Sequence, residues 1–255
     1  MKALSTYMKS FLVIFLITTD ICASSNDATS VFQEWFSSNG GLTSGLGLGT
    51  FTGVGRGVLV EKDIISGQEV LFVPSSMIFS ANSAQNSPDE LHRKLAKIFV
   101  NHEELVIALI LLEKCRGDQS FWKPYLDILP DYVPNLNTFS KSELAELQDP
   151  SFADEVVQGW QRLASQMHQF RQKAAPIWPC DIDQITMNEY LWASSIVDSR
   201  GFRLQGSVNL APFADMFNYR PHPQTRAYNG GNFFLKHHRL SKTGLQVVAD
   251  RYVRA

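Results

Sequence analysis

The spacing of apolar residues predicts a helix followed by two strands in the first third of the chain. Val31, Phe32, Trp35 and Phe36 form one apolar face at helical spacing, and Gly40-Gly41 ends the pattern. Two short apolar runs follow, at 58–60 (VLV) and 69–73 (EVLFV). Such runs are typical of β-strands, and Ser66-Gly67 between them is a turn signal.

The middle of the chain has a helical period. In residues 102–115 (HEELVIALILLEKC), the apolar residues Leu105, Ala108, Leu109 and Leu112 define a helix face. We expect further helices at 141–148, 153–174 and 187–200, and the last begins with a Thr186-x-x-Glu189 capping box. Strand-like segments return at 210–213, 233–236 and 245–249. Because strands and helices do not alternate, the pattern predicts an α+β fold, a β-rich domain interrupted by a helical insertion.

Composition narrows the range of partners. Hydrophobic residues make up 44% and charged residues 19%, as expected for a globular protein with a sizeable core. The formal net charge of −2 gives no basic surface of the kind that binds nucleic acid, so we predict no nucleic-acid partner.

The N-terminus has the pattern of a secretory signal peptide over residues 1–23. Lys2 and Lys9 precede the apolar run 11–17 (FLVIFLI), and cleavage would follow Ala23. This predicts the secretory pathway or an endomembrane, or a plastid reached by bipartite targeting, with no membrane association after cleavage. The alternatives are a frayed helix or a retained anchor. Cys115 and Cys180 then remain and can form one disulfide, which alone does not identify the compartment.

Residues 39–57 hold eight glycines. No Gly-Lys-Ser/Thr follows them, and they lead into a strand rather than a helix, so neither a P-loop nor a dinucleotide-binding turn fits. A flexible loop remains open as the simpler interpretation. No cysteine pair has zinc spacing, and the adjacent His237 and His238 would point to opposite faces of a strand, so we predict no metal site. A hydrolase is disfavoured because no G-x-S-x-G motif is present.

Several further motifs follow one another in a distinctive order. They are 55–60 (GRGVLV), 62–64 (KDI), 67–69 (GQE), Val73-Pro74, Glu113-Lys114, 120–126 (SFWKPYL), Leu129-Pro130, Trp192, Ser199-Arg200, Phe202 and 210–219 (LAPFADMFNY). In this order the chain resembles the SET-domain protein methyltransferases of the Rubisco large-subunit lysine methyltransferase type. The resemblance covers roughly residues 50–250 and implies a β-rich SET fold split by a long helical insert. It also implies a division of the chain. Residues 24–49 would form an N-terminal helix and a glycine-rich lead-in, and residues 50–87 the first β part of the SET domain. Residues 88–200 would form the helical insert, and residues 201–255 an incomplete C-terminal part.

The resemblance also implies a cofactor and its site. S-adenosylmethionine would be the methyl donor, and a lysine-containing protein segment the substrate. Gly55, Arg56 and Gly57 match the glycine turn whose backbone meets the cofactor, and Arg200 matches the arginine that holds its carboxylate. Asn218 matches the asparagine that fixes its amino group, with Asp215 in support. Tyr219 stands where the family usually has His, a residue that meets the adenine largely through its backbone.

The resemblance further implies a catalytic tyrosine, in an acidic-x-Tyr-Gly or Asp-Tyr-Gly motif near the end of the domain. Residues 247–251 (VVADR) resemble the strand before it, and we find no such motif before Ala255. Tyr252 is followed by Val253 where Gly is expected, and we do not assign it the role. The chain is therefore predicted to be C-terminally truncated, monomeric, and inactive as it stands, although of the protein-lysine methyltransferase class. The alternative is a non-catalytic SET-fold protein that binds a protein partner through the insert.

Overall fold

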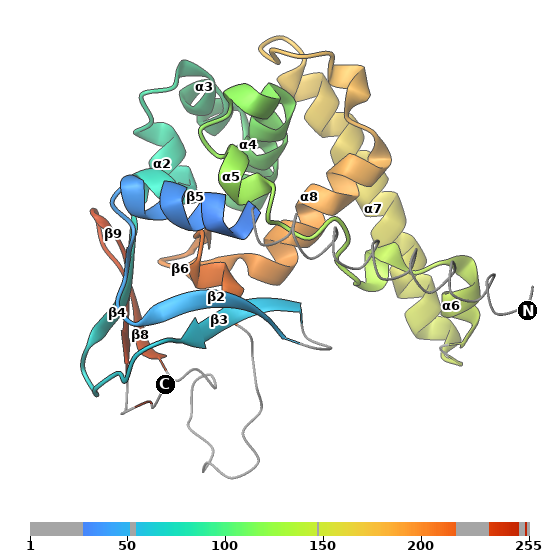
Figure 1. Ribbon diagram of the computed structural model, residues 1–255. Helices are drawn as coiled ribbons and strands as arrows, with labels where there is room; N and C mark the ends of the chain where they lie inside the picture. Colours follow the sequence, from blue (N-terminus) through green and yellow to red (C-terminus); the bar gives the residue numbers. More distant parts are fainter. Residues whose placement is uncertain (1–27, 52–54, 147, 218–234, 250–252, 254–255) are drawn as a thin grey trace, which may run out of the picture.

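The computed structural model of the 255-residue chain describes residues 28–51, 55–146, 148–217, 235–249 and 253. Most of its helices gather on one side and its strands on the other (Figure 1). The predicted signal peptide and two of the predicted site residues, Asn218 and Tyr219, lie outside the described residues. Within the described residues, no helix is long and apolar enough to cross a membrane.

Three antiparallel sheets form the β part. Strands β1 (Leu42–Thr43), β4 (Glu69–Pro74), β9 (Gly244–Ala249) and β8 (Leu235–Leu240) make a four-stranded sheet in that order. Strands β2 (Leu46–Phe51) and β3 (Gly55–Val60) pair as a hairpin. Strands β5 (Phe79–Ser80), β7 (Ser207–Leu210) and β6 (Phe202–Leu204) make the third sheet, joining segments from before and after the helices. The α+β order predicted from the sequence is therefore confirmed.

The glycine-rich segment is largely sheet, so its interpretation as a flexible loop is wrong. Gly49 in β2 lies opposite Gly57 in β3. A Cβ at Gly47 would meet the Glu61 side chain, and one at Gly49 would meet that of Leu59. Small residues therefore allow neighbouring side chains to lie over the hairpin, a use of glycine in a strand that composition alone does not distinguish from a loop.

Helices lie at all four positions predicted from 102 onwards, although the second spans Lys141–Glu146 and the third begins at Pro150. Asn101 caps the first of them through its side chain, and Thr186 and Glu189 form the predicted capping box of the last. The helices are α2 (Ala81–Gln85), α3 (Glu90–Ile98), α4 (His102–Arg116), α5 (Lys123–Leu126), α6 (Lys141–Glu146), α7 (Pro150–Ala174) and α8 (Met187–Arg200). Short 3-10 turns are η1 (Ser75–Met77), η2 (Gly117–Gln119), η3 (Leu136–Thr138), η4 (Ile182–Gln184) and η5 (Ala214–Met216).

Helix α4 is the centre of the core. Every residue from Leu105 to Glu113 is buried, so the single apolar face predicted from the sequence is too narrow. The helix packs against α3 and α8 and against strands β5 and β7. A helix that is apolar on all sides is one that its neighbours enclose.

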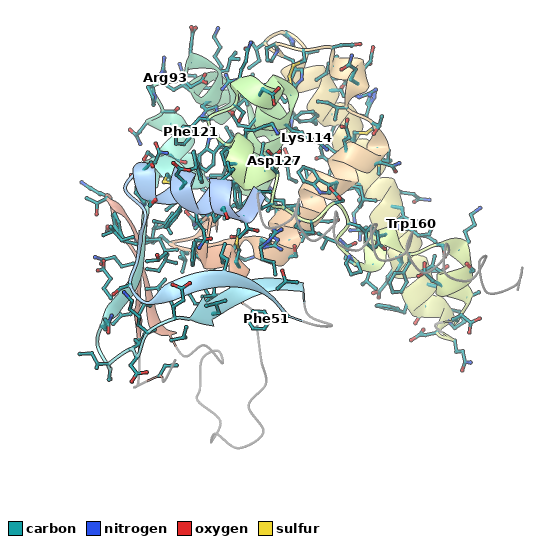
Figure 2. All side chains as sticks on the ribbon, viewed as in Figure 1. Phe51, Arg93, Lys114, Phe121, Asp127 and Trp160 are labelled. Atoms are coloured by element: carbon teal, nitrogen blue, oxygen red, sulfur yellow. A yellow bond between two sulfur atoms is a disulfide. The ribbon has the colours of Figure 1, made fainter. Side chains whose placement is uncertain are left out.

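The first helix, residues 28–38, places Phe32 and Phe36 in the core. Cys115 at the end of α4 forms a disulfide with Cys180, in the segment before α8. Trp160 lies on α7, and Phe51 at the end of the β2–β3 hairpin (Figure 2).

Candidate functional site

A buried polar network joins three elements beside the hairpin. Helix α8 ends at Arg200, whose Nη1 donates to the Asp215 carbonyl oxygen (3.1 Å) and to Asp215 Oδ2 (3.3 Å). The Tyr125 hydroxyl, from α5, donates to the same Oδ2 at 2.8 Å. The fold thus brings together two predicted site residues, Arg200 and Asp215. Tyr125, which was not predicted, is the third member of the network.

The backbone at Phe213 positions Asp215. Phe213 has φ +69°, a left-handed conformation that is costly for a bulky side chain. The strand predicted at 210–213 is wrong in its bounds, because β7 ends at Leu210, and the turn at Phe213 leads the chain into η5. The Phe213 ring is buried against Phe36 (centroids 5.3 Å apart) and Phe32 (6.3 Å), and this packing holds the turn in place.

Burial dominates the electrostatics of the network. Burial raises the pKa of the Asp215 carboxyl above its usual range, and the Arg200 guanidinium and the Tyr125 hydroxyl act against that rise. Burial, followed by the charge of Asp215, also raises the pKa of Tyr125 well above its usual range, so its hydroxyl remains a donor. Asp215 Oδ1 is buried and has no hydrogen-bond partner among the described residues.

Replacing Tyr125 with phenylalanine should therefore destabilise the fold. The buried carboxylate would lose one of its two side-chain donors, and a buried acceptor deprived of a donor costs about 1–3 kcal/mol. The free energy of unfolding, from urea titration, measures the change. Tyr132→Phe is the matched control, because Tyr132 is 62% exposed and its hydroxyl bonds only to Thr138 Oγ1 in the described structure. Equal losses in the two variants would contradict the assigned role of Tyr125.

The predicted glycine turn lies near this network. Gly55 opens β3 with φ +84°, and a Cβ there would meet no atom of the described residues within 4 Å. Gly57 pairs with Gly49 inside the hairpin. The Arg56 guanidinium donates from Nη1 to the carbonyl oxygen of Ile128, just after α5. Burial, followed by the positive charge of Arg200, lowers the pKa of Arg56.

In the sequence, Tyr125 stands out only as part of the motif 120–126 (SFWKPYL). Its ring lies in the core, against Phe32 and Trp122. The sequence did not predict the hydrogen bond from the Tyr125 hydroxyl to Asp215. One signal for it was available: a tyrosine in an apolar core needs a hydrogen-bond partner for its hydroxyl.

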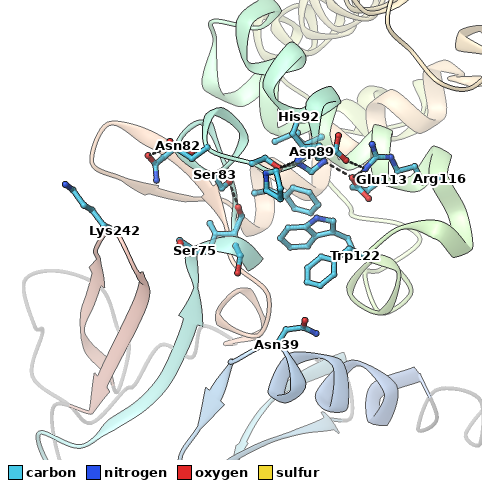
Figure 3. A pocket seen from close by; sticks show the side chains of 18 residues that line it. Asn39, Ser75, Asn82, Ser83, Asp89, His92, Glu113, Arg116, Trp122 and Lys242 are labelled. Atoms are coloured by element: carbon cyan, nitrogen blue, oxygen red, sulfur yellow. Dashed lines mark hydrogen bonds and ion pairs between the residues drawn. The ribbon is translucent and has the colours of Figure 1, made fainter.

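A second polar cluster lines a cavity of about 900 Å³ beside α3 and α4 (Figure 3). Its centre is Glu113, fully buried: Oε1 accepts from His92 Nε2 and Arg116 Nη1 (both 2.7 Å), and Oε2 accepts from Ser120 Oγ (2.6 Å). Arg116 Nη1 also contacts Asp89 Oδ2 at 2.6 Å. Asp89, His92 and Glu113 have the spacing of metal ligands, but the guanidinium of Arg116 already supplies the cation between the two carboxylates. We therefore interpret this cluster as a structural one.

Comparisons with known proteins decide the fold. The chain superimposes on the SET domain of LSMT bound to lysine and AdoHcy with a TM-score of 0.74 and 22% identity, over 90% of this chain and 52% of that one. Rubisco LSMT bound to sinefungin and monomethyllysine gives 0.72 and 23%, over 89% and 50%. The chain has a SET-domain fold. The resemblance drawn from the ordered motifs is confirmed, and so is the helical interruption of a β-rich SET fold.

Three curated relatives of this SET-domain chain are named as methyltransferases. The Rubisco large-subunit N-methyltransferase of Nicotiana tabacum, a chloroplastic protein, is 26% identical over 224 residues, 84% of this chain and 43% of the relative. The chloroplastic [fructose-bisphosphate aldolase]-lysine N-methyltransferase of Arabidopsis thaliana is 26% identical over 68% of this chain and 36% of its own length. The human actin-histidine N-methyltransferase is 27% identical over 77% and 35%. The chain thus spans less than half the length of these relatives. No protein-family model matches it.

Proposed function

We propose that this chain binds S-adenosylmethionine and belongs to a protein methyltransferase that acts on the side-chain nitrogen of lysine. One observation carries the proposal: in a SET fold, Arg200 at the end of α8 is held by a buried carboxylate, Asp215, while its own side chain stays 23% exposed. A planar guanidinium held in this way can bind a carboxylate through two parallel hydrogen bonds. The solved neighbours bind AdoHcy, sinefungin or AdoMet, and named relatives methylate lysine or histidine, which supports the proposal.

Each predicted residue has a part in this site. Arg200 would bind the carboxylate of the cofactor's amino acid end, with Asp215 and Tyr125 fixing its orientation. At the start of β3, where no atom of the described residues crowds Gly55, the cofactor would meet the backbone of Gly55, Arg56 and Gly57. Asn218 would fix the amino group, and the backbone of Tyr219 would meet the adenine.

The cofactor supplies the methyl group, and the protein supplies geometry and desolvation. Methyl transfer to nitrogen is an in-line displacement, and holding the reacting atoms in line can lower the barrier by about 7–11 kcal/mol. A target lysine must lose its proton first, which a desolvated channel favours by lowering the pKa of the amine. The catalytic tyrosine stays unassigned. Substitutions of the residues named above therefore test cofactor binding and not methyl transfer itself.

The compartment and oligomeric state are proposed with the function. The signal-like N-terminus, the disulfide between Cys115 and Cys180, and the chloroplastic relatives support an oxidising compartment or a plastid reached through the secretory route. We further propose a monomer with a lysine-containing protein segment as substrate.

Calorimetric titration with AdoHcy tests the function. We expect one site per chain, and a loss of affinity of roughly tenfold to a hundredfold in Arg200→Met, because a charge-assisted hydrogen bond contributes about 1.5–3 kcal/mol. Arg203→Met is the matched control, since Arg203 is 70% exposed and pairs with Glu103 at the surface. Absence of AdoHcy binding to the unmodified chain, or equal affinity in both variants, would refute the proposal.

A further inference from the structure

Two arginines from distant parts of the sequence lie on elements that pack around one buried carboxylate, that of Asp215. Arg200 contacts Asp215 directly, at 3.3 Å from Nη1 to Oδ2. Arg56 enters from the start of β3, and strand β3 packs against η5, which carries Asp215. The charges of Arg200 and Asp215 both act on Arg56, the first lowering its pKa and the second raising it. Two guanidinium groups and one carboxylate leave the group with an excess of positive charge.

The position of the Arg56 head is fixed. Its Nη1 donates to the Ile128 carbonyl oxygen, 72 positions along the chain, which ties the hairpin to the segment after α5. The same segment is also held by α8, where Trp192 Nε1 donates to the carbonyl oxygen of Pro130 at 2.9 Å. Arg56 is only half-buried, so it is restrained without being sealed from solvent. A restrained guanidinium loses less conformational entropy when it binds a ligand.

We propose that the side chain of Arg56, together with Arg200, binds the carboxylate of the cofactor's amino acid end and so selects ligands that carry it. This inference rests on the proposed function and adds a role for the Arg56 side chain, whereas the glycine turn requires only its backbone. The chemistry favours arginine over lysine at this position, because a planar fork can hold the Ile128 carbonyl oxygen and a carboxylate oxygen together.

Two ligands that differ in one group separate this role from a structural one. S-adenosylmethionine and decarboxylated S-adenosylmethionine share every part except the carboxylate. In the unmodified chain we expect tighter binding of the complete ligand. In Arg56→Met, which keeps most of the aliphatic stem, the affinity for S-adenosylmethionine should fall roughly tenfold to a hundredfold. The affinity for the decarboxylated ligand should stay unchanged or rise, because one positive charge near a cationic ligand is removed.

The control is Arg93→Met. Arg93 Nη1, like Arg56 Nη1, donates to backbone carbonyl oxygens, those of Ser87 (2.5 Å) and Pro88 (2.7 Å), but it lies on α3 (Figure 2). This variant should leave both affinities unchanged, and Arg56→Lys should fall between Arg56→Met and the unmodified chain.

The possible results are distinct. If Arg56→Met weakens both ligands by the same factor, or neither, Arg56 only supports the fold and the inference is overturned while the proposed function stands. If the unmodified chain binds neither ligand, the proposed function fails and the inference fails with it.

Discussion

Replacing Glu113 with alanine is expected to destabilise the protein by about 3–5 kcal/mol, the usual cost of removing one partner from a buried ion pair. Glu113 is 1% exposed and accepts hydrogen bonds from His92, Arg116 and Ser120. Arg116 would keep Asp89, but His92 Nε2 and the buried Ser120 hydroxyl would lose their carboxylate partner. The substitution would also leave a void beside Leu109 and Trp122, which line the same cavity.

Urea or thermal unfolding measures this change, and two comparisons make it specific. Glu113→Gln keeps the shape and some of the hydrogen bonds, so it should lie between alanine and the native residue. Glu90→Ala, which removes an exposed carboxylate paired with Lys94 at 2.9 Å, should have a far smaller effect. If Glu113→Ala proved no more destabilising than Glu90→Ala, the cluster would not be the structural anchor described above.

Opening the disulfide between Cys115 and Cys180 should have an effect of comparable size. The bond closes a loop with a sequence separation of 65, and the loss of loop entropy from the unfolded chain predicts a contribution of about 4 kcal/mol. The double variant Cys115→Ser/Cys180→Ser should therefore unfold at a lower urea concentration than the oxidised chain.

A reducing agent provides the internal comparison for this prediction. Dithiothreitol should lower the unfolding midpoint of the unmodified chain towards that of the double variant and leave the double variant itself unchanged. A midpoint that is the same for oxidised protein, reduced protein and the double variant would show that the bond does not stabilise the fold. Because both cysteines lie in the helical part, such a loss should not change which ligands the Arg200 site prefers.

The sequence was sufficient for elements whose signals are local. Helix α8 begins and ends where the capping box and period place it, and strands β4 and β9 correspond closely to their apolar runs. It was insufficient where glycines form a hairpin, because β2 carries no regular alternation of apolar and polar residues. The burial of α4 on every side also depends on its neighbours, which no local pattern specifies.

For the candidate site, the motif order identified Arg200 and Asp215, and the structure places them in contact. The roles of Tyr125 and of the Arg56 side chain depend on distances between segments far apart in sequence, so spacing could not predict them. The contacts of Glu113 could not be predicted for the same reason. In the sequence Glu113 belongs only to the Glu113-Lys114 motif, and His92 belongs to no motif. Such contacts follow from tertiary packing, which places α3 beside α4.

The left-handed turn at Phe213 has a consequence for the order of folding. Its ring rests on Phe36 and Phe32, which lie near the beginning of the described chain. During synthesis the first helix therefore emerges long before the segment that it must hold, and loop closure over so many residues is slow. The strained turn that positions Asp215 can become stable only after that closure. Ligand-binding competence should thus be among the last properties that the nascent chain acquires.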